Sequence, residues 1–212
     1  MPRTADHDER RALISRSFAE RLTENGLTAT TFARVAAGAG ISVGLIQHYF
    51  SSKEELLQFA YADCLQQRDL RIAQVITDGE AAGLTIRAIL GSATRELLPL
   101  DEPRLRELHV TQNLIAQGLH DPRLAEIAAS ADRDLQLRTA IAVRNGKECG
   151  EVAKTVDDAA SAARVLATAY GLATQLAIRA PHPRPSADSL TAAVLDPVLA
   201  SIFTGRCRRH SP

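Results

Sequence analysis

Helical periodicity runs through almost the whole chain of 212 residues. Ala, Leu, Arg, Gln and Glu fill most segments, whereas the alternating β-branched or aromatic runs typical of strands are scarce. Ile14, Phe18 and Leu22 recur every four residues, which places them on one apolar stripe of a helix. The sequence therefore predicts an all-α fold.

Turn-forming residues divide this pattern into about nine helices. Gly26 is expected in the left-handed conformation just after the first helix. Ser52 and Glu55 match a capping box, in which Glu55 reaches back to the amide of Ser52. Residues 181–185 are a Pro-rich linker, and Pro197 predicts a kink in the last helix. The predicted helices span residues 6–24, 30–37, 43–48, 52–77, 84–98, 102–119, 121–145, 156–180 and 187–203.

Charge and composition exclude several classes of protein. The first twenty residues are rich in Arg, Asp and Glu, and the apolar stretch 159–180 is interrupted by Arg164 and Arg179. Neither can be a secretory signal or the ~20-residue apolar run of a membrane span, so we expect a cytoplasmic protein without a membrane partner. The formal net charge is zero, and residues 1–60 hold seven basic and seven acidic side chains, which argues against a non-specific DNA coat.

The cysteines give no sign of a metal or redox centre. Cys64, Cys149 and Cys207 are widely spaced and form no CxxC pair, so we expect reduced thiols, no metal site and no cofactor. A redox sensor remains an alternative, because one exposed cysteine can suffice. The six histidines form neither HxxxH nor HExxH, and we find no catalytic set. We therefore expect no enzyme, although a helical enzyme stays a rival hypothesis.

Two short amphipathic segments flank a glycine-containing turn. Thr30 or Thr31 can cap the first helix, Gly38 and Gly40 allow a sharp reversal, and Ser42 can cap the second. Two short helices joined in this way indicate a helix-turn-helix, whose second helix enters the major groove of DNA.

Residues 30–57, TTFARVAAGAGISVGLIQHYFSSKEELL, closely resemble the TetR family of bacterial regulators, and the match extends upstream to Ile14, Phe18 and Gly26. The resemblance implies an N-terminal three-helix DNA-binding domain followed by a helical domain that binds an effector and dimerises through its last two helices. We place these domains at residues 1–51 and 52–204, with a basic tail at residues 205–212.

Several residues of the second short helix have side chains suited to DNA. Ser42 can cap the helix and contact phosphate, and Gly44 lets the backbone come close to DNA. Val43 or Leu45 can contact a thymine methyl group, while Gln47 or His48 can bond base edges or phosphates. Many relatives carry Tyr where this chain has Gln47, which predicts a different operator sequence. The predicted DNA-binding residues are Thr31, Arg34, Ser42, Val43, Gly44, Leu45, Gln47, His48 and Lys53, the last implied as a phosphate ligand by the resemblance.

The later segments look like the choline-responsive BetI branch of the family, with Asp121-Pro122-Arg123-Leu124 and Tyr170-Gly171-Leu172 as the matching runs. Aromatic residues make up only 4% of the chain and Trp is absent, so an aromatic cage for a quaternary ammonium is poorly supplied.

Within 102–119, the polar His109 and Gln112 lie among Leu105, Leu108, Ile115 and Leu119. These two bind either a ligand or neighbouring backbone. The predicted ligand-binding residues are Tyr61, Cys64, His109, Gln112 and Tyr170.

Small apolar residues form a stripe along the predicted helix 156–180. We expect it at a two-fold dimer interface, with intramolecular core as the alternative. A dimer would place two recognition helices about 34–36 Å apart, the spacing of two half-sites of a palindrome. The stripe comprises Ala162, Val165, Leu166, Ala169, Leu172, Ala173 and Leu176.

Together these patterns predict a homodimeric repressor that leaves a palindromic double-stranded DNA operator when a small-molecule effector binds. A transcriptional activator of the same fold and a nucleoid protein are the rival DNA-binding hypotheses.

Overall fold

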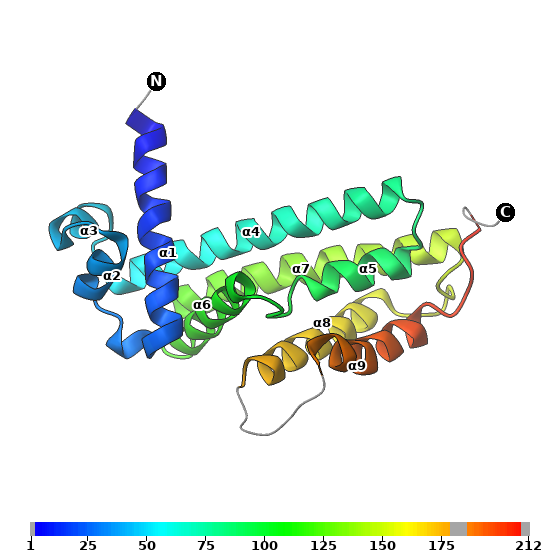
Figure 1. The fold of residues 1–212 in the computed structure, drawn as a ribbon. Helices are drawn as coiled ribbons and strands as arrows, with labels where there is room; N and C mark the ends of the chain where they lie inside the picture. The colour runs from blue at the N-terminus through cyan, green and yellow to red at the C-terminus, as the bar shows by residue number, and fades with distance from the viewer. Residues whose placement is uncertain (1–2, 179–185, 209–212) are drawn as a thin grey trace. The chain divides into compact units, whose positions relative to one another are not determined.

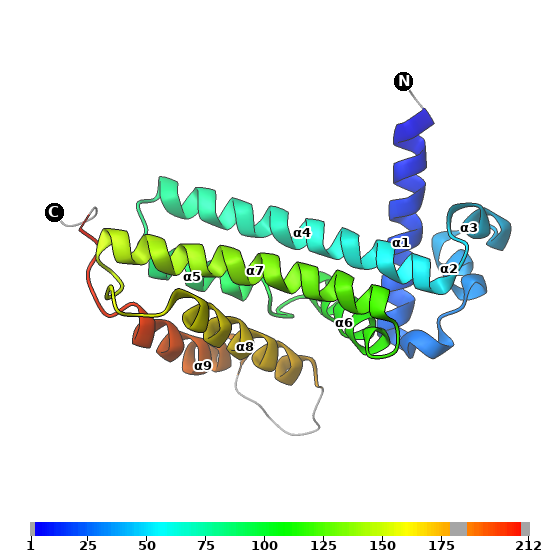
Figure 2. The same ribbon diagram turned by 180° about the vertical axis from the view of Figure 1, so that it is seen from behind.

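The computed structural model describes residues 3–178 and 186–208, and every regular element within these ranges is an α-helix (Figure 1; Figure 2). The all-α prediction is confirmed. None of the helices in the described ranges is long and apolar enough to cross a membrane. The helices are α1 (Arg3–Ala29), α2 (Phe32–Ala39), α3 (Val43–Tyr49), α4 (Lys53–Ala81), α5 (Ile86–Arg95), α6 (Glu102–Gly118), α7 (Pro122–Cys149), α8 (Asp158–Ala177) and α9 (Ala187–Ile202).

The chain forms two compact units that interleave along the sequence. The first contains Met1–Gln67 and Asp101–Ala128, and the second contains Arg68–Leu100 and Ala129–Pro212. The first unit therefore takes in α6 and the beginning of α4, beyond the predicted boundary at residue 51. Because α4 and α7 each contribute residues to both units, a single cut in the sequence does not separate them.

The core of the first unit forms where α1 packs against α2 and α6. Ile14, Phe18 and Leu22 are buried, as their spacing predicts. Ile46 of α3 and Phe50, which follows it, are buried in the same unit. One face of each short helix is thus committed to the interior.

Gly26 interrupts α1 with a backbone conformation that other residues avoid. Its φ is 74°, as expected, but its ψ is 166°, which lies in the extended mirror region and not in the left-handed helical region. The helix resumes for one more turn, and the hydroxyl of Thr30 donates to the carbonyl of Gly26 at 2.8 Å. Only glycine adopts this combination of angles without strain.

Two expected local features differ in the structure. Gly38 does not form the turn but lies inside α2, where an added Cβ would be 2.6 Å from the hydroxyl of Ser17. Gly38 thus allows α1 and α2 to pack closely, while Gly40, at φ 67°, ends the helix.

In the capping box, Ser52 accepts from the amide of Glu55 as expected, but the Glu55 carboxylate accepts from the amide and hydroxyl of Ser51, both at 2.7 Å, and not from Ser52. These two bonds hold the pKa of Glu55 below its ordinary value.

The second unit has its core among α5, α8 and α9, with α8 and α9 packed side by side (Figure 1). The α8 stripe predicted for a dimer interface is instead part of this core: six of its seven members are buried within one protomer, from Ala162 to Ala173, and Leu176 is half-buried. The intramolecular alternative is therefore correct for these residues, because α5 and α9 already cover them. The central cluster contains Leu90, Val143, Val152, Val165, Leu195, Leu199, Ile202 and Phe203.

Helix α7 extends beyond its predicted end. It continues through Gly146 to Cys149. Gly146 is needed for packing and does not end the helix, since Val152 and Phe203 lie where a side chain would be, with the nearest carbon 2.7 Å from an added Cβ. Pro197 lies inside α9, which continues past it to Ile202. The linker at 181–185 and the last four residues of the predicted basic tail lie outside the described residues.

Replacing Gly26 by Ala isolates the cost of its backbone conformation. No atom lies within 4 Å of an added Cβ at this position, so steric overlap contributes nothing. We expect Gly26→Ala to lower the free energy of unfolding by about 1–3 kcal/mol, measured by urea denaturation. An unchanged free energy would show that Gly26 is not strained in the folded protein.

Candidate functional site

Helix α3 presents a solvent-facing surface with no internal packing role. Ser42, Val43, Gly44, Gln47 and His48 are exposed, and Val43 retains 37% of its accessible surface. The exposed aliphatic side chain of Val43 beside the polar side chains of Gln47 and His48 leaves a mixed apolar and polar surface available to a partner. Leu45, also a predicted DNA-binding residue, is half-buried at its edge.

The turn before α3 is held by side-chain caps at both helices. The hydroxyl of Thr31 accepts from the amide of Arg34 at 3.3 Å, and that of Ser42 accepts from the amide of Leu45 at 3.1 Å. The amide of Ile41 closes the turn by donating to the carbonyl of Ala36 at 3.0 Å. These bonds fix α3 relative to α2, so the exposed face of α3 is a rigid surface.

Gly44 lies on this surface in open space. Only the Ser42 hydroxyl comes as near as 4.0 Å to an added Cβ, and its backbone is ordinary helix. Nothing inside the protein therefore requires glycine here. A requirement for glycine at this position would have to come from a molecule that binds α3.

The two predicted basic contacts already have partners within the protein. The ammonium group of Lys53 donates to the carbonyl of Leu27 at 3.0 Å, and Arg34 Nη1 donates to the carbonyl of Ala29 at 3.1 Å. Both bonds satisfy carbonyls at the end of the turn that follows Gly26. Binding to phosphate would use their remaining donors, of which an ammonium has three and a guanidinium five.

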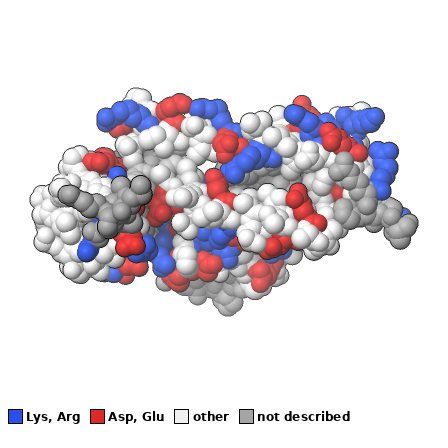
Figure 3. Space-filling model, turned by 90° about the horizontal axis from the view of Figure 1, so that it is seen from above, with Lys and Arg blue, Asp and Glu red and all other residues white. Residues whose placement is uncertain are grey.

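Charge on the face shown in Figure 3 is mixed, with Lys and Arg side chains interspersed among Asp and Glu. This agrees with the formal net charge of zero. No broad basic patch is visible on this face.

The second unit contains a cavity of about 290 Å³ between the last part of α4, α5 and α7. Its walls are mostly aliphatic, and none of its described lining residues is aromatic. The apolar lining residues are Ile72, Ala73, Ile76, Ile86, Ile89, Leu90, Ala93, Leu97, Leu135, Ile141, Ala142 and Leu166.

A charge cluster lies at the wall of this cavity. Burial opposes ionisation of Asp69, but hydrogen bonds from Arg138 and Arg68 outweigh it and hold the pKa of Asp69 below its ordinary value. Arg138 reaches Asp69 and Asp134, each at 3.0 Å. Two guanidinium groups thus face two carboxylates, and the cluster carries no net charge.

The five predicted ligand-binding residues lie outside the lining of this cavity. Tyr61 is buried in the first unit, while Cys64, His109 and Gln112 are half-buried there. Tyr170 is exposed on α8, and its hydroxyl lies 3.2 Å from a carboxylate oxygen of Asp132.

The prediction that apolar residues of α6 surround His109 is wrong for Ile115 and Leu119. Ile115 and Leu119 are 50% and 79% exposed, because α6 buries Val110 and Leu114 instead. The sequence reasoning also missed Asp69 and Arg138, whose separation along the chain hides their pairing.

Two family models match the chain. Residues 19–59 match the model described as bacterial regulatory proteins, tetR family, and residues 83–202, more than half of the chain, match the C-terminal model of BetI-type transcriptional repressors. The chain belongs to the tetR family of bacterial regulatory proteins. The resemblance seen in residues 30–57, and the looser one to the BetI branch, are thus confirmed.

Curated relatives in the tetR family are transcriptional regulators and not enzymes, as we predicted for this chain. PksA from Bacillus subtilis is 28% identical over 57% of this chain and 57% of its own length. BetI from Burkholderia pseudomallei is 28% identical over 82% of this chain and 80% of its own length. The match thus spans little more than half of the PksA regulator.

Solved structures of tetR-type regulators share the fold. A transcriptional regulator from Rhodococcus sp. Rha1 superposes with a TM-score of 0.76 at 26% identity, covering 92% of this chain and 96% of that one. A regulator from Saccharomonospora viridis in complex with choline superposes with a TM-score of 0.77 at 19% identity, covering 92% and 98%. These structures support an N-terminal helix-turn-helix unit followed by a helical C-terminal region.

Gly44→Ala separates folding from DNA binding on α3. Ala is the better helix former by up to about 1 kcal/mol, so the thermal unfolding midpoint should stay level or rise. If the backbone of α3 approaches DNA at this position, the added methyl group should weaken binding at least about tenfold, or ~1.4 kcal/mol. Fluorescence anisotropy with a duplex selected by the wild-type protein measures this, and unchanged affinity would remove Gly44 from the interface.

Proposed function

We propose that this protein is a sequence-specific transcriptional repressor that binds a palindromic operator as a homodimer and is released by a small-molecule effector. The observation that carries the proposal is the exposed, rigidly held face of α3, whose opposite face is buried through Ile46. Membership of the tetR family supports the same mode of binding.

On this proposal, α3 enters the major groove with Val43, Gly44 and Gln47 toward the bases. Gln can bond adenine through two hydrogen bonds, and an aliphatic side chain can contact a thymine methyl group. Thr31, Ser42 and Lys53, together with Arg34, would bind the flanking phosphates, with Leu45 and His48 at the edge of the contact.

Dimerisation is proposed through the faces of α8 and α9 that do not enter the core. Ala163, Ala167 and Gly171 of α8 are exposed at intervals of four residues, and an added Cβ at Gly171 would meet no atom within 4 Å. Val194 of α9 is 37% exposed. Small residues at this spacing allow two helices to pack closely, which supports a dimer formed by the opposite face to the stripe first predicted.

Selection of bound duplexes from a random DNA pool tests the DNA-binding proposal. Wild-type protein should enrich palindromes with half-sites about 10 base pairs, or a multiple of one helical turn, apart. Ala167→Arg places a charge on the proposed dimer face and should yield a monomer by analytical ultracentrifugation, with loss of palindromic enrichment. Enrichment of non-palindromic DNA by the wild-type protein would contradict the dimeric model.

A reporter gene under the selected operator then determines the regulatory sign. Repression that requires the intact α3 face supports the proposal, whereas transcription that rises with the regulator would identify an activator instead.

The cavity between α4, α5 and α7 supports an uncharged, mostly aliphatic effector. A cavity of about 150 Å³ accepts benzene, so one of 290 Å³ suits a ligand of roughly twelve non-hydrogen atoms. Aliphatic walls favour an aliphatic ligand, the Asp69–Arg138 cluster is neutral, and Glu80, the other charged lining residue, is exposed to solvent. Hydroxyl or carbonyl groups on the ligand could still bond to its polar atoms.

Choline is a weaker candidate for this cavity, although a structural neighbour binds it. Quaternary ammonium groups bind best over aromatic faces, and the described lining of this cavity has none. Of the two carboxylates that line the cavity, Asp69 already pairs with two arginines and Glu80 is exposed to solvent.

Helix α4 provides the proposed route from effector to DNA. Residues 69–80 of this single helix line the cavity, while its first turns belong to the unit that contains α3. A ligand that moves the lining part of α4 would also move its beginning, because a continuous helix transmits a displacement along its axis. The operator-bound and ligand-bound states then differ in the position of α3.

Thermal-shift measurements with three probes of similar length test the effector class: 1-decanol, decanoate and decyltrimethylammonium, with choline added as a fourth. We expect a rise in midpoint only with 1-decanol. Ala73→Phe, on an exposed lining position, should abolish the rise by filling the cavity, while the matched Ala81→Phe, outside the lining, should retain it. A larger shift with choline or with decyltrimethylammonium would contradict the neutral aliphatic class.

A further inference from the structure

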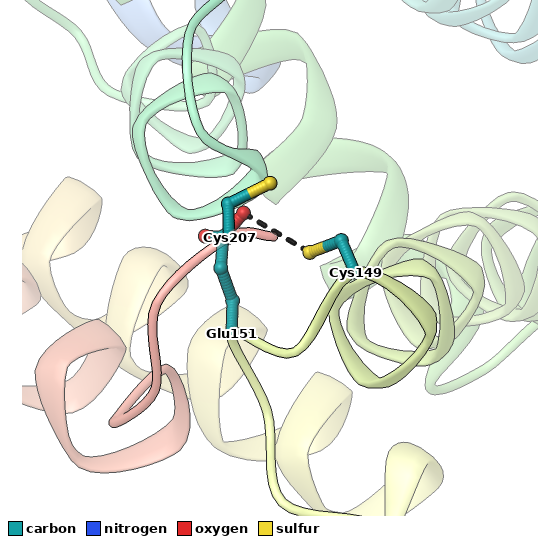
Figure 4. A group of neighbouring side chains, drawn as sticks. All are labelled: Cys149, Glu151 and Cys207. Atoms are coloured by element: carbon teal, nitrogen blue, oxygen red, sulfur yellow. Dashed lines mark hydrogen bonds between the residues drawn. The ribbon is translucent and has the colours of Figure 1, made fainter. Parts of the chain in front are cut away.

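A second group of chemically active side chains lies in the second unit, apart from the cavity lining. Cys149 ends α7, Glu151 follows in the next loop, and Cys207 lies in the segment after α9 (Figure 4). All three side chains are buried, and no pair of their ligand atoms is more than 4.8 Å apart. The chain therefore brings together two thiols that are widely separated in the sequence.

Backbone hydrogen bonds hold these three segments together. The amide of Gly205 donates to the carbonyl of Glu151, and the amide of Arg208 donates to the carbonyl of Cys149, both at 2.8 Å. These two bonds place Cys207 between them beside the end of α7. The position of its thiol is thus fixed by the fold and not by a flexible tail.

The Glu151 carboxylate is oriented by the start of α5. One of its oxygens accepts from the amide of Ile86 and the other from that of Arg87, each at 2.9 Å. Carboxylates that bind metals are commonly held by such outer hydrogen bonds, which leave a second lone pair on each oxygen. The Cys149 thiol donates to one of these oxygens at 3.3 Å and lies 3.4 Å from the carbonyl of Gly146, so thiol and carboxylate already face one another.

We propose that Cys149, Glu151 and Cys207 bind a thiophilic divalent cation, with Zn²⁺ as the best match. In tetrahedral zinc sites, Zn–S and Zn–O bonds of about 2.3 and 2.1 Å separate sulfur from oxygen by roughly 3.6 Å. Cys149 Sγ lies 3.3 Å from Glu151 Oε1, so a small side-chain adjustment accommodates the ion. Two thiolates beside one carboxylate favour zinc over magnesium or calcium, which prefer oxygen ligands.

Binding converts both thiols to thiolates. The cation replaces the two thiol protons, which pass to solvent, and the resulting site has one net negative charge. The amide groups at the start of α5 offset part of that charge through Glu151. A solvent molecule would complete the four-coordinate shell.

A reversible disulfide between the cysteines is the competing use of this cluster. A disulfide would use only the two sulfur atoms and would give no role to the carboxylate oxygen that lies 3.3 Å from Cys149 Sγ. A metal ion takes all three of the gathered side chains as ligands.

The proposed ion would connect both ends of the segment that contains α8 and α9. Residue 149 precedes α8 and residue 207 follows α9, so the metal would cross-link the two ends of this segment. This cross-link requires neither DNA nor an effector. The site is thus a structural one, and it does not depend on the function proposed above.

Cobalt substitution of the full-length protein tests this proposal. Protein stripped with EDTA under reducing conditions and titrated with Co²⁺ should bind one ion per protomer. It should show thiolate-to-cobalt charge-transfer absorption together with the visible bands of a tetrahedral site. Binding of Co²⁺ or Zn²⁺ to the stripped protein should release about two protons per ion to a pH indicator, and Zn²⁺ should then displace bound Co²⁺ without further release.

Cysteine variants identify the ligands. Cys149→Ser and Cys207→Ser should each lose roughly half of the charge-transfer absorption and weaken Zn²⁺ binding at least about tenfold. Cys64→Ser, on α4 and outside the cluster, is the matched control and should bind as the wild type does. If Cys149→Ser fails to fold, Cys207→Ser and the wild-type spectrum still decide the question.

Three results would overturn the proposal. The wild-type protein could lack charge-transfer absorption with Co²⁺, or the absorption could survive in both cysteine variants. Alternatively, mass spectrometry of the unreduced protein could find a Cys149–Cys207 disulfide that prevents metal binding.

Discussion

The packing of α1 against α2, and of α2 against α3, is the interaction on which the DNA-binding unit depends. Ile14, Phe18 and Leu22 are buried in the same unit as Val35 and Ile46, so each short helix has one face committed to the core. A helix of seven residues is too short to be stable by itself, so this packing and the capped turn before it hold α3 in place. Its outer face is consequently free for recognition, and it is rigid.

Glycines appear in this structure for two different physical reasons. Gly38 is required by contact within the protein, because Ser17 occupies the space of its side chain. Gly44 and Gly171 are surrounded by open space, although each lies in a helix where Ala would be more favourable. On the proposed function, the space beside Gly44 is taken by DNA and the space beside Gly171 by a second copy of the chain.

The sequence was sufficient where local pattern decides the structure. Spacing of Ile14, Phe18 and Leu22 predicted a buried stripe, and Ser42 caps α3 as its position before an apolar segment indicates. It was insufficient wherever the partner of a residue lies far along the chain. The stripe from Ala162 to Ala173 could face either a second protomer or α5 and α9, and periodicity alone cannot distinguish these surfaces.

Long-range pairing also explains why the second unit was the harder part to predict. Asp69 and Arg138 meet at the cavity wall, and Cys149 meets Cys207, although no short motif links either pair. A cavity is a place where helices fail to pack, and the sequence has no periodic signal for it. The candidate ligand residues chosen from α4 and α6 were polar positions on apolar helices, a pattern that also describes half-buried residues of the first unit.

Hydroxyl-radical footprinting on the DNA upstream of the gene for this protein tests the central claim, that the exposed face of α3 reads a palindrome as a dimer. The account predicts two symmetric protected regions whose centres are about one helical turn apart, or a multiple of it, with strongest protection of the backbone flanking the major groove. It also predicts loss of both regions in a variant with a charged α3 face, such as Val43→Asp. Uniform protection along the duplex, or a footprint unaffected by Val43→Asp, would contradict it.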